Sequence, residues 1–377
     1  MKKTTKGALL AVAATLSVSV IALGQGQGQS AHTMAQSAAH QAKSASKAID
    51  LQETGSTLLW PLFQLWVPAY KHVASNVFLT PSGTGSGVGI AEATQGVVQI
   101  GASDAYMSSG QLAQTPGMLN IPLAISAQQI MYKIPGIKAS THLHLTGNVI
   151  ALMYMGKIKY WNAPQVQRLN KGLKLPHLAI VPIHRHDGSG DTFLFTQFMT
   201  DTNAAWANPT TGVGYGTSVS WPAVPGALDG VGNSGVVQIA ARTPGSIAYV
   251  GISWLNNALK DGMGEAMLQN RAGRFLLPDH ATISAAADKM TAKTPRDERI
   301  SLIYAPGPNS YPIINYEYAI VKETQANVQT ASAVKNLLLW AISPKGGNQA
   351  SFMGQVHFLP LPASIFPLSK AQIEKIH

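Results

Sequence analysis

Short apolar runs alternate with small polar loops along most of the chain. Runs bounded by Gly and Pro are typical of buried strands, whereas apolar residues spaced three to four apart are typical of helices. The pattern predicts strands at residues 77–79, 97–105, 128–134, 178–183 and 246–252, and a long extended segment at 311–321. It predicts helices at residues 58–66, 90–94, 146–161, 193–199, 235–241 and 333–342. Strands that alternate with helices indicate an α/β fold.

Polar loops stand at the C-terminal ends of several predicted strands. The loops at 52–57 and 80–89 each lead into a helix, and the strand at 97–105 ends in a polar tip that carries Asp104. In α/β sheets, ligands bind beyond the carboxyl ends of the strands, so these loops are candidate ligand contacts. Asp104 has a second interpretation, in which it only caps the turn that follows.

The loop from Arg185 to Phe193 has the composition of an anion-binding helix N-terminus. Its glycines let the backbone approach a ligand, its Ser and Thr hydroxyls add donors, and Arg185 adds a planar guanidinium. The first-turn N–H groups of a helix have no partners within the helix, so they suit an oxyanion. A plain capped helix without a ligand explains the same residues, because Ser and Asp caps are common.

The glycine-rich loop at 80–89 favours an anion but not a nucleotide. A glycine-rich turn at a helix start can cradle an anion with its backbone amides. The loop lacks the third glycine of the dinucleotide fingerprint and the Gly-Lys of the P-loop. Cys is absent from the chain, which excludes disulfides, thiolate metal sites and a Cys nucleophile.

The sequence offers little for catalysis or for a metal. None of the loops contains G-x-S-x-G, and Ser56, Ser86 and Ser189 stand at predicted helix starts, where a hydroxyl needs no catalytic role. Two His-x-His pairs, at 142–144 and 184–186, have a spacing that could share a metal on a strand, but neither has a clear third ligand. We therefore expect no metal and no cofactor.

The N-terminus has the features of an export signal. Residues 1–24 combine three lysines, an apolar stretch and a small-x-small end, and residues 25–49 form a leader of mostly Gln, Ser, Ala, Gly and His. A retained membrane anchor is the alternative, although the apolar stretch is marginal for spanning a bilayer. We expect an exported, periplasmic or cell-surface protein that is not a lipoprotein through cysteine.

Composition and charge narrow the class of protein further. The 377 residues are 46% hydrophobic and only 12% charged, which suits two domains with a sizeable core. The formal charge is +10, of which three charges lie in the signal, and the lysines and arginines form no long basic run. This pattern gives no sign of a nucleic-acid partner but would attract small anions or an anionic envelope surface, unless it is only a solvated surface.

Taken together, four motifs resemble those of the periplasmic phosphate-binding proteins that serve the high-affinity phosphate ABC importer. The motifs are Gly55-Ser56-Thr57-Leu58, Gly83-Thr84-Gly85-Ser86, Gly101-Ala102-Ser103-Asp104 and Arg185-x-Asp187-Gly188-Ser189-Gly190, with further similar stretches at 156–161, 244–250 and 311–313. The resemblance extends from about residue 51 to the C-terminus. It implies a two-lobed periplasmic-binding-protein fold of type II, in which each lobe is a mixed sheet flanked by helices and crossing strands join the lobes. Lobe 1 would comprise residues 50–131 and 311–377, and lobe 2 residues 132–310.

The resemblance also implies a set of phosphate ligands and a partner. The ligand residues would be Ser56, Thr57, Leu58 through its backbone N–H, Ser86, Asp104, Arg185, Ser189 and Gly190. A carboxylate beside an anion is informative, because hydrogen phosphate carries a proton that Asp104 can accept and sulfate carries none. A site built around such a hydrogen bond can discriminate by roughly 10⁴–10⁵. The implied protein is a monomeric, non-enzymatic subunit that delivers phosphate to ABC permease subunits.

This chain departs from the family pattern at two positions. Many relatives carry Thr where this chain has Asp191, and some carry Phe where it has Leu58. Asp191, which we include in the phosphate site, either pairs with Arg185 and orients it or accepts a second phosphate proton. Three other functions are considered: a binding protein for another tetrahedral oxyanion, a secreted phosphatase, and a surface anion-binding protein without a transporter.

Overall fold

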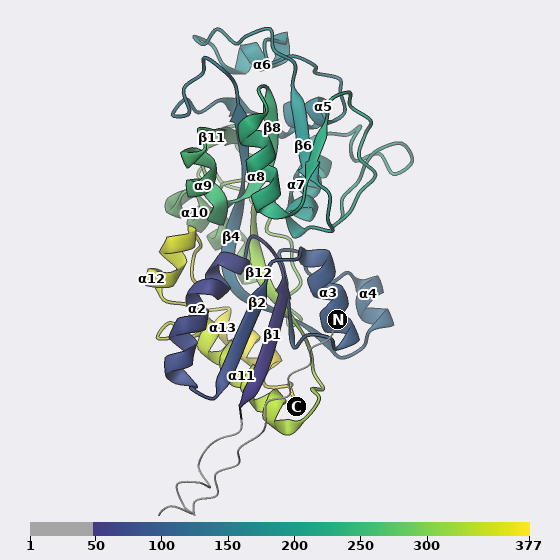
Figure 1. The fold of residues 1–377 in the computed structure, drawn as a ribbon. Coiled ribbons are helices and arrows are strands. Elements are labelled where there is room, and N and C mark those ends of the chain that lie inside the picture. The colour runs from purple at the N-terminus through teal and green to yellow at the C-terminus, as the bar shows by residue number, and fades with distance from the viewer. Residues whose placement is uncertain (1–47) are drawn as a thin grey trace, which may run out of the picture. The chain divides into compact units, whose positions relative to one another are not determined.

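The computed structural model describes residues 48–377, so the predicted signal and nearly all of the predicted leader lie outside the described residues. The described chain is a mixed α/β structure (Figure 1). Within residues 48–377, the helices are too short or too polar for any one of them to cross a bilayer.

Most strands belong to one long, mixed sheet. The strands are β1 (Ile49–Gly55), β2 (Val77–Ser82), β3 (Ile100–Ser103), β4 (Met118–Lys133), β5 (His144–Leu145), β6 (Val181–Arg185), β7 (Leu228–Gly230), β8 (Ser246–Gly251), β9 (Gly264–Glu265), β10 (Met267–Gln269), β11 (Phe275–Leu276) and β12 (Ile314–Lys322). The sheet has the order β2-β1-β3-β12-β4-β8-β6-β7, with β9 beside β4, and β11-β10-β5 form a small separate sheet.

Helices connect these strands. The α-helices are α2 (Trp60–Val73), α3 (Ser86–Gln95), α4 (Ser109–Gln114), α5 (Gly147–Tyr154), α6 (Pro164–Leu169), α7 (Gly190–Thr202), α8 (Gly232–Arg242), α9 (Leu255–Lys260), α10 (His280–Met290), α11 (Val328–Ile342), α12 (Ala350–Met353) and α13 (Phe366–Ile373). Three short 3-10 turns are η1 (Ile252–Trp254), η2 (Thr291–Lys293) and η3 (Gly354–Val356).

Strand β4 joins two halves of the sheet. Its first part pairs with β12 along residues 118–127, and its last six residues pair with β8. We call lobe 1 the half built on β1, β2, β3 and β12, and lobe 2 the half built on β6, β7 and β8. Figure 1 shows β4 and β12 running between the halves. The lobe boundaries predicted at residues 131/132 and 310/311 stay predictions.

The helices cover both faces of the sheet in lobe 2. Ile247 and Tyr249 of β8 belong to the main core together with Phe195 of α7, whereas Ala248 and Val250 pack in a second cluster with Val236 and Val237 of α8. Successive side chains of a strand point to opposite faces, so α7 and α8 lie on opposite sides of β8. This explains why β8 is an uninterrupted buried run in the sequence.

Several predicted elements have different bounds in the structure. The strand predicted at 128–134 is part of a 16-residue strand, because β4 is buried along almost its whole length and shows no alternation. The helix predicted at 146–161 ends at Tyr154, since Gly156 has a φ of 68° that a helix cannot continue through. The strand predicted at 97–105 is confined to β3, and the one at 178–183 is displaced to β6.

Candidate anion-binding site

The first part of the site lies where two parallel strands of lobe 1 end side by side. Gly55 at the end of β1 is paired with Ala102 in β3, which places Ser56 beside Asp104. The Ser56 hydroxyl donates a hydrogen bond to the Asp104 carboxylate and accepts from the backbone N–H of Leu58 at 3.1 Å. In the turn that follows, the Ala105 N–H donates to Ser103 and the Met107 N–H donates to Asn120, so these donors are capped by residues other than Asp104, contrary to the second interpretation of this residue.

Helix α3 adds a second hydroxyl to Asp104. The Ser86 hydroxyl lies 3.4 Å from Asp104 Oδ2 and accepts from the Asp104 backbone N–H at 3.3 Å. Asp104 is 2% exposed, and Ser56 and Ser86 are equally buried. The three motifs of lobe 1 thus meet at one buried carboxylate.

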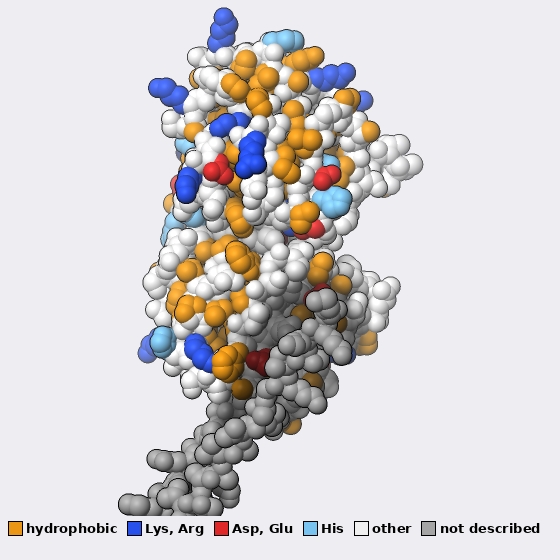
Figure 2. Space-filling model, in the orientation of Figure 1, with side chains coloured by type: hydrophobic (Ala, Val, Ile, Leu, Met, Phe, Trp, Pro, Cys, Tyr) orange, Lys and Arg blue, Asp and Glu red, His pale blue; other side chains and the backbone are white. Residues whose placement is uncertain are grey.

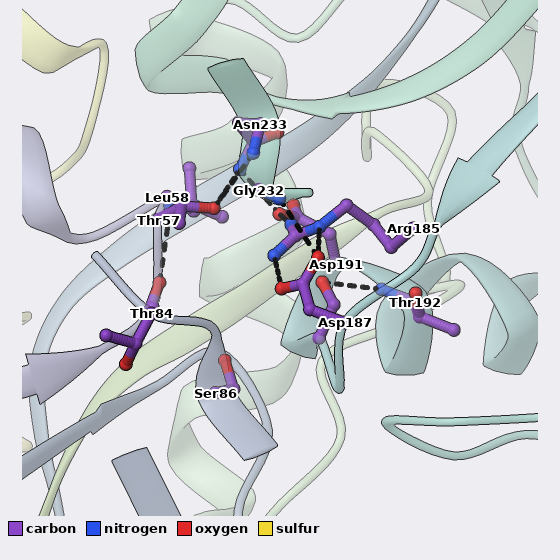
Figure 3. Close-up of polar contacts among 12 residues, drawn as sticks. Thr57, Leu58, Thr84, Ser86, Arg185, Asp187, Asp191, Thr192, Gly232 and Asn233 are labelled. Atoms are coloured by element: carbon purple, nitrogen blue, oxygen red, sulfur yellow. Dashed lines mark hydrogen bonds and ion pairs between the residues drawn. The ribbon is translucent and has the colours of Figure 1, made fainter. Parts of the chain in front are cut away.

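Lobe 2 contributes a guanidinium held by two carboxylates. Arg185, the last residue of β6, donates from Nε to Asp187 Oδ1 at 2.8 Å and forms an ion pair with Asp187 Oδ2. Its Nη1 lies 2.9 Å from Asp191 Oδ2. The Arg185 side chain is 1% exposed, and Figure 3 shows it between the two carboxylates. Pairing of Asp191 with Arg185, one of the two roles considered for it, is present in the structure.

Asp191 has further donors besides Arg185. Its Oδ2 accepts from Asn233 Nδ2 at 2.6 Å, and its Oδ1 accepts from Gln128 Nε2 at 3.1 Å. Ser189, one residue before α7, is the N-cap of this helix and accepts from the Thr192 N–H. The start of α7 therefore carries a capping hydroxyl and a carboxylate with three donors on it.

The two lobes touch directly at the site. Thr57 of lobe 1 accepts at its hydroxyl from the backbone N–H of Asn233 at 3.1 Å and from Asn233 Nδ2 at 3.0 Å (Figure 3). The Gly87 N–H donates to the Gly188 carbonyl at 2.9 Å. A Cβ built on Gly190 would lie 2.5 Å from Asp104 Cβ, far inside contact distance. Only glycine fits at that point of the interlobe contact.

Burial shapes the electrostatics of the site. It raises the pKa of Asp104 well above its usual range, and the neighbouring Glu317 and Asp191 carboxylates raise it further, against the Ser56 hydrogen bond. Burial also raises the pKa of Asp191, while Arg185 opposes the rise. The pKa of Asp187 is lowered, because its hydrogen bonds with Arg185 and the arginine's charge outweigh its partial burial. The site thus holds several carboxyl groups around one guanidinium.

The predicted ligand residues lie in this one region. Ser56, Ser86 and Gly190 each lie against Asp104, and Arg185 contacts Asp191. Leu58 is fully buried, and its N–H is engaged by Ser56. The role of each residue in binding a ligand stays a prediction.

The histidine pairs have other neighbours. His142 Nδ1 lies 3.0 Å from the Glu265 carbonyl, and the His144 ring stacks on Phe275. The His184 ring stacks on Trp221. Among the described residues, no group of three or more His, Asp or Glu side chains is placed to hold a metal ion.

Sequence reasoning gave no role to four residues of the site, one of which, Asp187, was named only within a motif and holds Arg185. Asn233 and Gln128 donate to Asp191, and Glu317 faces Asp104. Glu317 has a recognisable signal, since it is the one acid in the apolar strand β12. Asn233 and Gln128 have no comparable signal, because amides are common at helix starts and in strands.

Comparison with known proteins places the chain among binding proteins. A family model described as a PBP superfamily domain matches residues 30–345. The chain is 30% identical over 320 residues to the phosphate-binding protein PstS of Xylella fastidiosa, covering 85% of this chain and 84% of that one. It is 31% identical to the PstS of Methanocaldococcus jannaschii, covering 78% and 79%. The fold is similar to the solved structure of a periplasmic phosphate-binding protein, PfluDING, with a TM-score of 0.68, 19% identity, and 86% and 93% of the two chains covered.

Proposed function

Because this chain belongs to the PstS family of phosphate-binding proteins within the PBP superfamily, we propose that it binds inorganic phosphate between its lobes and delivers it to an ABC-type permease. The members of this family are named as binding proteins and not as enzymes, so the secreted phosphatase is set aside. The observation that carries the proposal is the meeting of Asp104 in lobe 1 with the start of α7 in lobe 2.

The surroundings of Asp104 suit a tetrahedral oxyanion. Ser56 and Ser86 supply hydroxyls from lobe 1, and the start of α7 lies against Asp104 from lobe 2. The first turn of a helix has N–H groups without partners in the helix, which suit an anion. Arg185 supplies a buried positive charge. A buried anion needs its lone pairs and its charge satisfied, since an uncompensated ion in a low-dielectric site is costly. Donors from both lobes would meet this need only when the lobes are closed.

Asp104 gives the site a means to choose phosphate over sulfate. A carboxylate oxygen accepts a hydrogen bond from the P–OH group of hydrogen phosphate. Sulfate has no proton at neutral pH, so it would place an oxygen lone pair against the Asp104 carboxylate. Two facing acceptors without a proton leave buried polar atoms unpaired, and this penalty produces the discrimination. The alternative of another oxyanion predicts that sulfate or molybdate competes with phosphate.

Asp191 orients Arg185 in this proposal. Its Oδ2 already accepts from Arg185 and Asn233, and its Oδ1 accepts from Gln128. A carboxylate oxygen has about two lone-pair directions, so little capacity is left for a second phosphate proton. The orienting role is therefore favoured over the role of second proton acceptor.

Further expectations about location and partners rest on the family. We propose that the protein is exported, acts as a monomer, is divided into lobes at about residues 131/132 and 310/311, and has no nucleic-acid partner. On the face shown in Figure 2, the Lys and Arg side chains stand scattered, most of them over the part of the molecule that carries α5 to α9 and a few below it, and they form no continuous basic patch. Scattered basic residues are compatible with the last expectation.

Calorimetry with phosphate, arsenate and sulfate tests the proposal, with the full chain compared to Asp104→Asn. We expect the wild-type protein to bind phosphate and arsenate and to reject sulfate. Asp104→Asn should lose most of the selectivity, because an amide can donate to sulfate as well as accept from phosphate. A wild-type protein that binds sulfate as well as phosphate, or a variant that keeps full selectivity, would contradict the role of Asp104.

A further inference from the structure

A second carboxyl group, Glu317 of β12, stands directly behind Asp104. Strand β12 is antiparallel to β3, and the last pair of their ladder is Tyr318 with Ser103. Glu317 and Asp104 are the residues that follow this pair on the two chains, beside a register shift of β12 against β4 between Glu317 and Tyr318. Residues of neighbouring strands that share a face have their side chains close together. Besides burial, the neighbouring Glu317 carboxyl raises the pKa of Asp104 through its charge and through a hydrogen bond between the two side chains. Glu317 is completely buried.

The hydrogen bonds of Glu317 leave one of its oxygens for Asp104. Glu317 Oε1 accepts from Ser126 Oγ at 2.5 Å and from Asn315 Nδ2 at 3.0 Å. Oε2 has no donor among the described residues. Asn315 Nδ2 also reaches the backbone carbonyl of Asp104, at 3.3 Å, which ties the two positions together. A carboxyl group can only hydrogen-bond another carboxyl group if a proton lies between them.

The charge of the cluster requires such a proton. The buried carboxyl groups of Asp104, Asp191 and Glu317, together with the half-buried Asp187, oppose the single guanidinium of Arg185. Four carboxylates against one cation, with a phosphate anion added, would leave a large uncompensated negative charge in a low-dielectric site. Adjacent buried carboxyl groups relieve such repulsion by keeping one proton between them, and they then titrate as a pair.

We propose that Glu317 is a positioning residue of the anion site that shares one proton with Asp104. The pair then carries one negative charge and offers the phosphate one free hydrogen-bond acceptor. This inference rests on the proposed function. When the pH rises far enough to remove the shared proton, the pair carries two charges and repels the phosphate. Glu317 therefore sets the alkaline limit of phosphate binding. Burial raises the pKa of Glu317 to about 7, which supports a loss of the shared proton at mildly alkaline pH.

The groups around Glu317 indicate that the Asp104–Glu317 pair is the group whose titration affects phosphate binding. Two acids face Glu317: Asp104, just after β3, and Asp191 of α7. The charge of Asp191 is paired with Arg185. Strand β4 presents Ser126 and β12 presents Asn315, neither of which titrates. Helix α3 presents Ser86 to Asp104 on the same side. Asp191 is present in both proteins compared below, and in both it has the charge of Arg185 as its partner.

The test measures the phosphate dissociation constant of the full chain between pH 5.5 and pH 9, for wild type and Glu317→Gln. Gln keeps the shape and a donor for Asp104 but holds no titratable proton, so its pair cannot take on a second negative charge. Near pH 6 the two proteins should bind alike. Above about pH 7 the wild type should weaken relative to the variant by up to tenfold per pH unit, the limit for one linked proton. The titration of phosphate itself is common to both proteins and cancels in the ratio.

Two further measurements separate this role from a structural one. Calorimetry at pH 8.5 in buffers of different ionisation enthalpy should show that the wild type takes up more protons per phosphate than Glu317→Gln does. Glu298→Gln is the matched control, because Glu298 is also fully buried and burial raises its pKa to about 8, yet it contacts Ser369 and not the site. Its pH profile for phosphate should match that of the wild type.

Each outcome decides a different question. Parallel pH profiles for wild type and Glu317→Gln, with equal proton uptake, would overturn this inference while phosphate binding stands. Absence of phosphate binding by the wild type at every pH would overturn the proposed function instead. Should Glu317→Gln fail to fold, the ¹³C shifts of the wild-type side-chain carboxyls decide: a coupled titration of Asp104 and Glu317 is expected, and two ionised groups at pH 6 would refute the shared proton.

Discussion

At the scale of single residues, Asp191 has two opposite effects on a bound anion. It holds the guanidinium of Arg185 in place, and it also cancels part of the charge of that guanidinium. Asp187 already fixes Arg185 through Nε and Nη2, so the orientation is secured twice. A second carboxylate does not strengthen the positive charge that attracts the anion, because each added carboxylate repels the anion. At an effective dielectric constant of about 20, two unit charges 4 Å apart interact by roughly 4 kcal/mol.

Asp191→Thr should therefore bind phosphate more tightly than the wild type does. The substitution removes a buried negative charge and frees donors of Asn233 and Gln128 for the anion. We expect a gain of about tenfold near pH 6 and a larger one near pH 8.5, where phosphate is mostly a dianion and feels twice the repulsion. Isothermal titration at the two pH values measures both gains. A weaker variant would mean that the hold of Asp191 on Arg185 outweighs its charge, and an equal gain at both pH values would argue against a charge effect.

At the scale of elements, the site depends on how closely the start of α7 approaches the end of β3. Gly190 is the first residue of α7, and a side chain there would overlap the Asp104 carboxyl group. Ala is a better helix former than Gly, so the substitution does not harm the helix itself. A methyl group at this position would prevent the lobes from closing.

Gly190→Ala should lower phosphate affinity by at least about 100-fold, because roughly 2.8 kcal/mol or more of contact between the lobes is lost when they cannot close. Gly235→Ala in α8 is the matched control. A Cβ on Gly235 would lie 3.5 Å from its nearest neighbour, which is ordinary contact, so this variant should bind normally and be more stable by about 0.5–1 kcal/mol. Thermal unfolding and phosphate titration of both variants check this. Normal binding by Gly190→Ala would show that the lobes close elsewhere.

The elements differ in how well the sequence predicts them, for physical reasons. Helix α8 and strand β8 are found almost at their predicted positions, because both are apolar runs with clear ends. The predicted helix at 146–161 is too long, since apolar residues continue past the Gly156 turn. The grouping of the four motifs in one site came from the family resemblance. Periodicity does not say that β1 and β3 are neighbours, nor that β12 returns to place Glu317 beside Asp104.

At the scale of the whole molecule, buried acids tie stability to pH. Burial raises the pKa of Glu265 to about 7 and that of Glu298 to about 8, and it raises the pKa of Glu53 well above its usual value. The unfolded chain releases these protons near the ordinary Glu value of 4.5. Between that value and the folded pKa, the folded protein binds more protons than the unfolded chain. The free energy of unfolding must therefore fall as the pH rises through this window.

We expect the phosphate-free protein to be most stable near pH 5 and to lose several kcal/mol of unfolding free energy by pH 9. One group whose pKa rises by two to three units contributes on the order of 3 kcal/mol, less where the side chain is partly reached by water. The acid side of the profile has the opposite sign, because the pKa of Asp187 is lowered in the folded protein. Asp187 stabilises the fold at pH values above the ordinary pKa of Asp, and this contribution is lost as the pH falls through the lowered pKa. Urea denaturation across pH 4 to 9 measures the profile. Glu298→Gln should flatten its alkaline side, because an amide has no proton to lose. A stability that rises from pH 5 to pH 9 would show that these acids are ionised in the folded protein.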